Sequence, residues 1–360
     1  MAHQPPLPSI RLLQVRAKQL VKAHRIGDAA AIRFINKFGR ASDTDEPLSV
    51  TVAYQAIAHH SGCRDWSALK NAIAFIREID AATDYGPTNS DLDTLVTLLG
   101  VRYPVAAWAF RYLQREGSRG HQAVLRGMQH RSAKVRRACT DYLDHAVPSW
   151  DDATYQRLEA AIDDPTPKVR ASVLHALGCQ RCKDNAPDEH AIDLFMHGMT
   201  DASAKVRRTA VGGMWQFRHD VRVHDGLLKA LEDESSRVRK TAAAALASCV
   251  ENPRVPRALI ERLVCESNLQ VIQTLLMSVR PAATKFVGQH RDAIVSKHGS
   301  GVEGRVRTEN TKRPPTLFYP LGILAGDTSA GADSRYWLRF ILDAEGIVRS
   351  ATAHDGMAEI

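Results

Sequence analysis

The heptapeptide Asp201-Ala-Ser-Ala-Lys-Val-Arg207 recurs along this 360-residue chain with little change. The other copies are His130-Arg-Ser-Ala-Lys-Val-Arg136, Asp164-Pro-Thr-Pro-Lys-Val-Arg170, Asp233-Glu-Ser-Ser-Arg-Val-Arg239 and the divergent Glu266-Ser-Asn-Leu-Gln-Val-Ile272. The valines of consecutive copies are 34, 37, 32 and 33 residues apart. Self-similarity with a period of about 20 to 50 residues is typical of a solenoid, in which each repeat packs only against its neighbours. The chain is therefore predicted to be a repeat protein.

Each copy of the heptapeptide predicts a polar turn followed by the second helix of a helix pair. A serine or threonine in the middle of the phrase has the chemistry of an N-cap, whose hydroxyl accepts a hydrogen bond from a helix N–H group. The predicted caps are Ser132, Thr166, Ser203 and Ser235. The valine is expected in the core between helices, and apolar residues at helical spacing before each copy predict the first helix of the pair.

Paired helices of this length, with an acidic residue in the turn and Val-Arg opening the second helix, resemble HEAT-like repeats of the short bacterial type. The resemblance covers roughly residues 90–280. It implies an all-α fold, a right-handed α-solenoid of about five to six helix pairs. In that family the turn acid and the helix arginine form a ladder between neighbouring repeats. The residues that would carry this ladder are Asp164, Asp201 and Asp233 with Arg170, Arg207 and Arg239, whereas His130 replaces the acid in the first copy.

The first 83 residues are predicted to form a helical module ahead of the array. Apolar spacing predicts one or two helices over 10–38, a helix over 50–60 and another from Trp66 to about Ile79. This part resembles a short helical segment that precedes repeats in bacterial proteins, including ankyrin-type ones. The matching residues are Ala58, His59, Gly62, Trp66, Leu69 and Lys70, with Cys63 where an aromatic residue usually stands. The resemblance implies a capping or adaptor module rather than an activity.

The repeat array is predicted over 84–298, followed by a polar linker over 299–316 and a small β-hairpin tail over 317–360. The runs Trp337–Leu342 and Ile347–Thr352 are rich in β-forming residues and flank a turn at Gly346. Because a lone hairpin is marginally stable, this tail is expected to pack on the last repeats or to pair with a strand near Thr316–Phe318.

The composition limits the class of protein. Lysine and arginine number 48 against 40 acidic residues, and the resulting net charge of +8 permits an anionic partner without requiring one. The six cysteines have no disulfide-scaffold spacing, the N-terminus has no signal pattern, and no apolar run is long enough to span a membrane. These features predict a cytoplasmic protein.

A metal site is the first alternative to a plain scaffold. The candidate ligands are Cys179 and Cys182, a Cys-x-x-Cys pair, together with His190. Zinc in proteins takes four cysteine or histidine ligands, and one such pair supplies two of them. An ordinary loop with two thiols explains the same residues, and the sequence predicts no cofactor.

The basic residues of the phrase recur with its period, so stacking is expected to align them along one edge of the array. The predicted partner-binding residues are Lys134, Arg137, Lys168, Lys205, Arg208, Arg237 and Lys240. The function predicted from this pattern is a non-enzymatic scaffold or adaptor that binds another protein. The alternative is a nucleic-acid-binding HEAT-like protein, because the same row of cations suits phosphates.

The enzymatic extreme of that alternative is a DNA glycosylase. HEAT-like repeats also build alkylpurine glycosylases, and the residues that resemble their tryptophan and catalytic aspartate are Trp150, Asp151 and Trp215. Nothing in the sequence places these three residues opposite one another. Binding of DNA is expected to weaken steeply with salt, with a slope of about 0.9 per phosphate contacted, which separates it from protein binding.

Overall fold

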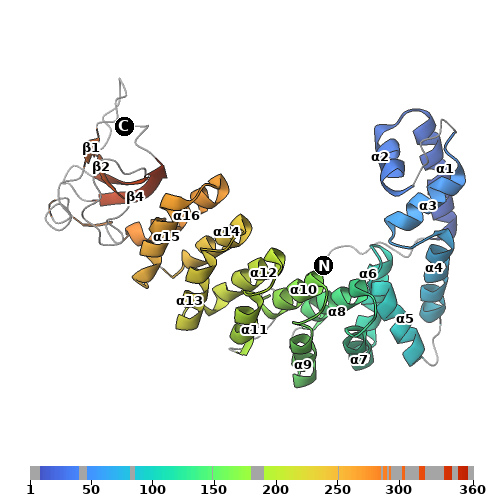
Figure 1. Ribbon diagram of the computed structural model, residues 1–360. Helices are drawn as coiled ribbons and strands as arrows, with labels where there is room; N and C mark the ends of the chain where they lie inside the picture. Colours follow the sequence, from blue (N-terminus) through green and yellow to red (C-terminus); the bar gives the residue numbers. More distant parts are fainter. Residues whose placement is uncertain are drawn as a thin grey trace. The chain divides into compact units, whose positions relative to one another are not determined.

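The computed structural model of the chain (Figure 1) describes residues 9–39, 47–81, 86–147, 149–179, 190–249, 251–284, 287–289, 292, 302–304, 316–320, 336–342 and 348–355. The chain forms two compact units. The first comprises Met1–Ala176 with Arg181–Asp184, and the second comprises Leu177–Gln180 with Asn185–Ile360. Among the helices of the described part, none is both long and apolar enough to cross a membrane.

The first unit begins with four helices, α1 (Ile10–Arg25), α2 (Ala29–Phe38), α3 (Val50–His60) and α4 (Trp66–Ala81). The predicted helical range 10–38 is two helices because Gly27 turns the chain with a φ of +77°. Asp28 then caps α2, since its carboxylate accepts the N–H of Ala31 at 2.8 Å. Helices α1, α2 and α3 pack on one another and bury Ala17, Ile35 and Ala53 completely.

Helix pairs follow in the same unit: α5 (Asn89–Leu99) with α6 (Val105–Arg115), α7 (Gly117–Gly127) with α8 (Ala133–Ala146), and α9 (Asp152–Ala160) with α10 (Pro167–Leu177). Helix α5 packs on α6, α7 and α8, and α4 packs on α6. Trp108 of α6 is 1% exposed and anchors this core. The N-terminal helices therefore continue into the repeats through α4.

The second unit contains α11 (His190–Gly198), α12 (Ala204–Met214), the short 3-10 helix η2 (Trp215–Phe217), α13 (Val221–Ala230), α14 (Ser236–Leu246), α15 (Arg254–Cys265) and α16 (Leu269–Ala283). The second helices α12, α14 and α16 pack in a row, and each first helix packs on its own second helix (Figure 1). The valines of the phrase, Val206, Val238 and Val271, are each 1% exposed. This arrangement confirms the predicted α-solenoid, with the phrase at the start of every second helix.

The chain ends in a four-stranded antiparallel sheet, with β1 (Val302–Gly304), β2 (Thr316–Pro320), β3 (Tyr336–Leu342) and β4 (Val348–Asp355) in sequence order. The pair β3–β4 is the predicted hairpin, and β2 is its predicted third strand. Strand β4 packs on α16, and the N–H and C=O of Val348 bond to Gln289 and Gly288. Strand β1 lies inside the segment predicted as a linker, because three residues are too few to give a β pattern.

A surface of free cations beside an arginine ladder

The arginine that ends each phrase is held by two repeats at once. Arg207 donates from Nε and Nη2 to the two carboxylate oxygens of Asp233 at 2.7 and 3.0 Å. Its Nη1 donates to the backbone carbonyl of Asp201, in its own turn, at 2.8 Å. The guanidinium therefore ties the turn of one repeat to the acid of the next, and only 10% of the side chain is exposed.

The same geometry recurs at the other rungs within each unit. Arg136 donates to both oxygens of Asp164 at 2.6 and 2.9 Å, and Arg239 donates to both oxygens of Glu266 at 2.7 and 2.8 Å. Glu266 belongs to the divergent fifth copy, so that copy keeps its acid although its own arginine is lost. The ladder implied by the family resemblance is present at these three rungs, where Arg136, Arg207 and Arg239 each pair with the acid of the following phrase.

The arginines of the ladder lower the pKa of the acids that they bind. The bonds from Arg239 and from the N–H of Asn268 outweigh the effect of burial and lower the pKa of Glu266 to about 2. Burial alone would raise the pKa of Asp233, but the bonds from Arg207 and from the N–H of Ser235 leave this pKa below its ordinary value. Both carboxylates are therefore ionised at neutral pH.

The predicted N-caps are at the right positions but act differently. Ser132, Ser203 and Ser235 are the N-cap residues of α8, α12 and α14, yet their hydroxyls accept no N–H from the helix. Instead, the cap residue's own N–H donates to the side chain two positions earlier, as Ser203 does to Asp201 at 2.7 Å. This Asx-type turn orients the acid toward the arginine, and the helix N–H groups donate no bond to the cap hydroxyl.

His130 takes the part of the acid in the first phrase. The N–H of Ser132 lies 3.0 Å from Nδ1 of His130, in the place where the other copies use a carboxylate. Arg136 also donates to the backbone carbonyl of His130 at 2.9 Å. His130 therefore keeps the turn but offers no carboxylate to an arginine of the preceding repeat. Arg136, in the same phrase, still pairs with the acid of the following phrase.

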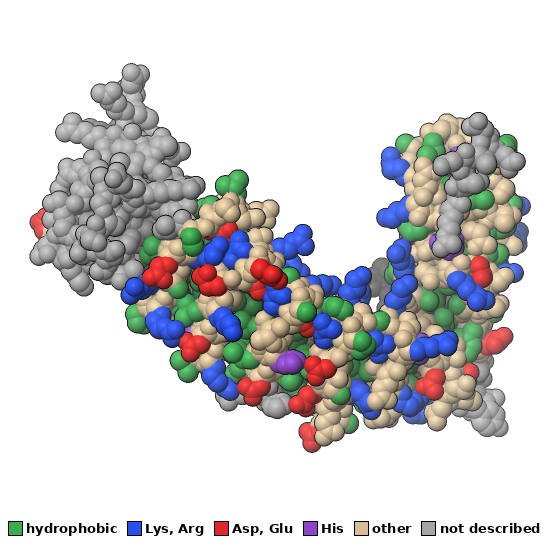
Figure 2. Space-filling model, viewed as in Figure 1, with side chains coloured by type: hydrophobic (Ala, Val, Ile, Leu, Met, Phe, Trp, Pro, Cys, Tyr) green, Lys and Arg blue, Asp and Glu red, His purple; other side chains and the backbone are tan. Residues whose placement is uncertain are grey.

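The neighbouring cations are not used by the ladder. All seven predicted partner-binding residues are exposed, on α8 and α10 in the first unit and on α12 and α14 in the second: Lys134, Arg137, Lys168, Lys205, Arg208, Arg237 and Lys240. Arg137 lies 3.4 Å from Asp141. The side chains of the other six form no hydrogen bond or ion pair with any residue that the structure describes. Figure 2 shows lysine and arginine side chains at many places on the surface of the repeats.

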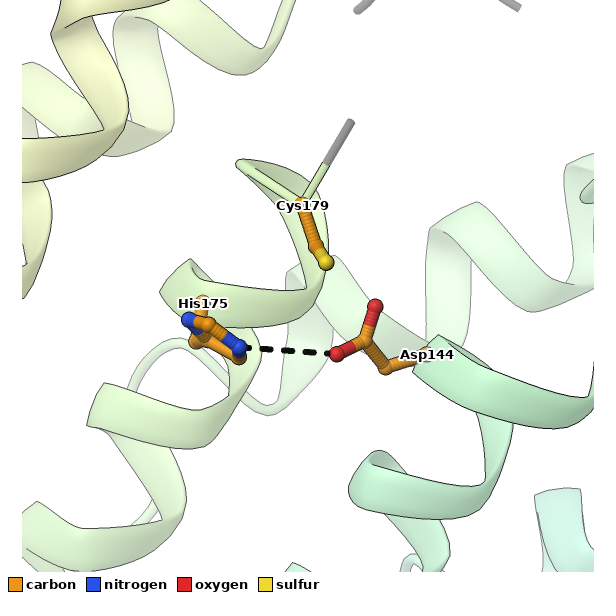
Figure 3. Close-up of side chains that lie close together, drawn as sticks. All are labelled: Asp144, His175 and Cys179. Atoms are coloured by element: carbon orange, nitrogen blue, oxygen red, sulfur yellow. Dashed lines mark ion pairs between the residues drawn. The ribbon is translucent and has the colours of Figure 1, made fainter. Parts of the chain in front are cut away.

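The predicted metal ligands are described only in part. Cys179 is half-buried two residues beyond the end of α10, Cys182 lies outside the described residues, and His190 begins α11. The first unit also contains a buried carboxylate that the sequence analysis missed (Figure 3). Asp144 of α8 is 2% exposed and lies 3.6 Å from Nε2 of His175 on α10. This pair joins two second helices. A zinc site at Cys179, Cys182 and His190 stays an untested alternative to an ordinary loop.

The three residues that resemble those of a glycosylase make contacts that stabilise the fold. Asp151 caps α9 by accepting the N–H of Thr154 at 2.9 Å. Trp150 donates to the carbonyl of Leu143 at 3.1 Å, and its ring meets the Tyr155 ring edge-on. In the second unit, Trp215 is 45% exposed and carries the Arg218 guanidinium over its ring. Each contact fixes a loop or a helix end.

Comparison with known protein families finds one match, which lies in the second unit. Residues 192–280, which run from α11 into α16, match the family model of HEAT repeats. These residues are HEAT repeats, whereas the likeness of the N-terminal module to segments before ankyrin-type repeats stays a prediction. No curated protein matches the chain.

Several solved structures are similar at low sequence identity. YibA of Escherichia coli is 15% identical, with 77% of this chain and 99% of that chain covered and a TM-score of 0.41. A computationally designed armadillo repeat protein for modular peptide recognition is 16% identical, with 57% and 97% covered and a TM-score of 0.37. The Kap95:Nup1 complex gives 12% identity, 80% and 42% coverage and a TM-score of 0.42.

Proposed function

We propose that this chain is a non-enzymatic scaffold that binds an acidic protein partner through the exposed cations of its second helices. The observation that supports the proposal is that neighbouring cations of one phrase have different roles. Arg207 and Arg239 pair with the acids of the ladder. Arg208 and Lys240, one position further on, are exposed, and their side chains make no hydrogen bond or ion pair within the described residues.

The repeat makes such a surface effective. An exposed ion pair contributes about 0 to 1 kcal/mol, so one lysine cannot hold a partner. A row of cations at the fixed spacing of the helix pairs adds several such contacts. The ladder makes that spacing rigid, which lowers the entropy lost on binding.

Nucleic acid is the alternative anion, and it would use the same residues. Its phosphates would contact the same exposed lysines and arginines, and the affinity would fall steeply as salt is raised. Glycosylase-like activity is the enzymatic form of this alternative. Its test is base release from an alkylated duplex by the wild-type chain and by Asp151→Asn.

The experiment compares two charge-reversal variants of the full chain. The surface variant carries Lys205→Glu, Arg208→Glu and Lys240→Glu. The matched control carries Lys18→Glu, Lys22→Glu and Lys229→Glu, three exposed lysines of α1 and α13. Each chain is used to capture partners from a lysate with and without nuclease, and each captured protein is purified and titrated directly against both variants.

We expect a protein that binds the wild type and the control equally and loses the surface variant, with circular dichroism unchanged in all three. Equal binding to the surface variant would refute a role for these cations. Capture that nuclease abolishes, together with duplex binding by the purified chain, would instead establish the nucleic-acid alternative.

A further inference from the structure

Two adjoining hollows lie in the first unit, where the N-terminal helices meet the first repeats. Their volumes are about 510 and 540 Å³. Both are lined by Gly62, Arg102 and Lys134, so they form one continuous depression, here called the basic hollow. Its walls come from the end of α2, the turn before α4, the turn before α6 and the first turns of α8 and α10.

The walls carry far more positive than negative charge. Six cations line the hollow, namely Lys37, Arg64, Arg102, Lys134, Arg137 and Lys168, against one acid, Asp141. Arg137 lies 3.4 Å from Asp141, and Arg64 lies 3.0 Å from Asp65. The side chains of Arg102, Lys134 and Lys168 have no hydrogen bond or ion pair with other described residues. At least three positive charges are therefore available to an incoming anion.

The excess charge acts on a neighbouring group. Burial is the main cause that lowers the pKa of His60, and the positive charges of Arg16, Arg102 and Lys37 lower this pKa further. Cations from α2 and from the turn before α6 thus act on one histidine of α3. The region has a positive potential that an anionic ligand would relieve.

The two sides of the hollow are fixed to each other. The ring of His59 lies between the end of α2 and the turn before α4, with Nδ1 2.7 Å from the carbonyl oxygen of Phe38 and Nε2 2.9 Å from that of Arg64. Gly62 in that turn has a φ of +80°, and a side chain there would strike the backbone N of Arg102. The hollow is therefore preformed, so little ordering is lost when it is filled.

The lining is not wholly polar. Val101, Ala133 and Ala138 are half-buried on its floor, beside the buried Leu99. Two aromatic rings line the hollow: the imidazole of His59, and the ring of Phe38, which packs against Phe34 and His60 at centroid distances of 5.1 and 5.0 Å. A floor of small apolar groups under a cationic rim suits carboxylates interspersed with aliphatic side chains. A single strand is bound by stacking successive bases on aromatic side chains, whereas this lining carries mostly cationic and small apolar side chains.

We propose that the basic hollow binds an acidic segment of a partner protein, with glutamates or aspartates on the cationic rim and aliphatic side chains on the floor. This inference rests on the proposed scaffold function and deepens it, since it names the site and the chemistry of the segment. It also assigns a role to Lys37, Arg64 and Arg102, which lie outside the recurrent phrase.

The test uses the full chain and a short fluorescein-labelled peptide of alternating glutamate and leucine, followed by fluorescence anisotropy. The hollow variant carries Lys37→Ala, Arg64→Ala and Arg102→Ala. The matched control carries Lys18→Ala, Lys22→Ala and Lys229→Ala, three exposed lysines that belong neither to the lining of the hollow nor to the recurrent phrase. We expect the hollow variant to bind the peptide at least about tenfold more weakly, a change of about 1.4 kcal/mol, and the control to bind within about twofold of the wild type.

Peptide variants separate the two parts of the site. Replacing every glutamate by glutamine is expected to abolish binding, and replacing every leucine by serine is expected to weaken it. Arg102→Ala can disturb the fold through the contact at Gly62, which the double variant Lys37→Ala with Arg64→Ala leaves intact. The double variant is expected to bind the peptide about fivefold more weakly than the wild type, because it removes two exposed ion pairs.

Equal peptide binding by the hollow variant and the wild type would overturn the proposal. So would a duplex DNA that displaces the peptide with equal affinity, because the hollow would then be a phosphate site. The outcomes stay distinct from those of the scaffold test. A captured partner that needs Lys205, Arg208 and Lys240 but ignores the hollow leaves the scaffold standing and removes only this site.

Discussion

Removal of one ladder arginine is expected to destabilise the second unit while an adjacent exposed arginine is dispensable. Arg207 makes two bonds to Asp233, one to Glu234 and one to the carbonyl of Asp201, all between 2.7 and 3.0 Å. Arg207→Ala would strand the carboxylate of Asp233, whose side chain is 11% exposed. Breaking a buried pair by removing one partner costs about 3–5 kcal/mol.

The lower end of that range applies here, because Asp233 keeps the N–H of Ser235 at 2.7 Å and retains some solvent. We expect Arg207→Ala to lower the free energy of unfolding by about 3 kcal/mol. The matched variant Arg208→Ala removes an exposed side chain without a bond among the described residues, and we expect a change within about 0.5 kcal/mol.

Urea unfolding followed by circular dichroism measures the global effect. Repeat arrays do not always unfold in one step, so hydrogen exchange of the α12 and α14 amides supplies the local measurement. In a double-mutant cycle with Asp233→Ala, the coupling energy is expected to reach about 2 kcal/mol. Arg207→Ala and Arg208→Ala with the same unfolding midpoint, or a coupling near zero, would refute the account of the ladder as an inter-repeat tie.

Four further outcomes are expected. Glu266 has a folded pKa of about 2, below its unfolded value of about 4.3, so its contribution is complete above the unfolded value and is lost as pH falls toward 2; Glu266→Gln should flatten that part of the pH–stability curve. Burial lowers the pKa of His121, so the unfolded chain binds its proton first, and urea midpoints should fall as pH drops below about 6.5 but fall less in His121→Gln. Gly62→Ala places a side chain at positive φ against the backbone N of Arg102 in the turn before α6 and should lower the melting temperature, at a cost of about 1–3 kcal/mol. Burial raises the pKa of the Cys139 thiol to about 12, so iodoacetamide should label the exposed Cys265 in the native chain well before Cys139, and mass spectrometry of timed digests will show the order.

The fold was readable from sequence wherever one local pattern was repeated. The valine of each phrase predicts a buried helix start, and Val206, Val238 and Val271 are indeed buried. The hydroxyl caps were wrong in mechanism. The carboxylate of Asp201 accepts the N–H of Ser203, whereas the hydroxyl of Ser203 accepts no N–H of the helix, and the sequence alone does not distinguish an Asx turn from an N-cap. Strand β1 was missed because its order comes from pairing with β2 rather than from its own residues.

The candidate sites divide in the same way. The exposure of Lys205 and Arg208 follows from the helical spacing beside a buried valine, so periodicity was enough to find them. The hollow depends on Lys37, Arg64 and Arg102, which come from three segments with no shared motif. The contacts of His59 with the carbonyls of Phe38 and Arg64 and the packing of Gly62 against Arg102 bring these segments together. Such contacts between distant turns leave no periodic trace in the sequence.

This difference bears on which cations are functional. In a Lys-Val-Arg run at a helix start, consecutive side chains point about 100° apart, as the helix period requires. When Val206 enters the core and Arg207 turns to the next acid, Lys205 must face solvent, so its recurrence follows from building the spine. No such necessity places Lys37, Arg64 and Arg102 around one hollow. Their convergence, with no acid of the ladder to neutralise them among the lining residues, is therefore the stronger argument for an anionic partner than the regular row itself.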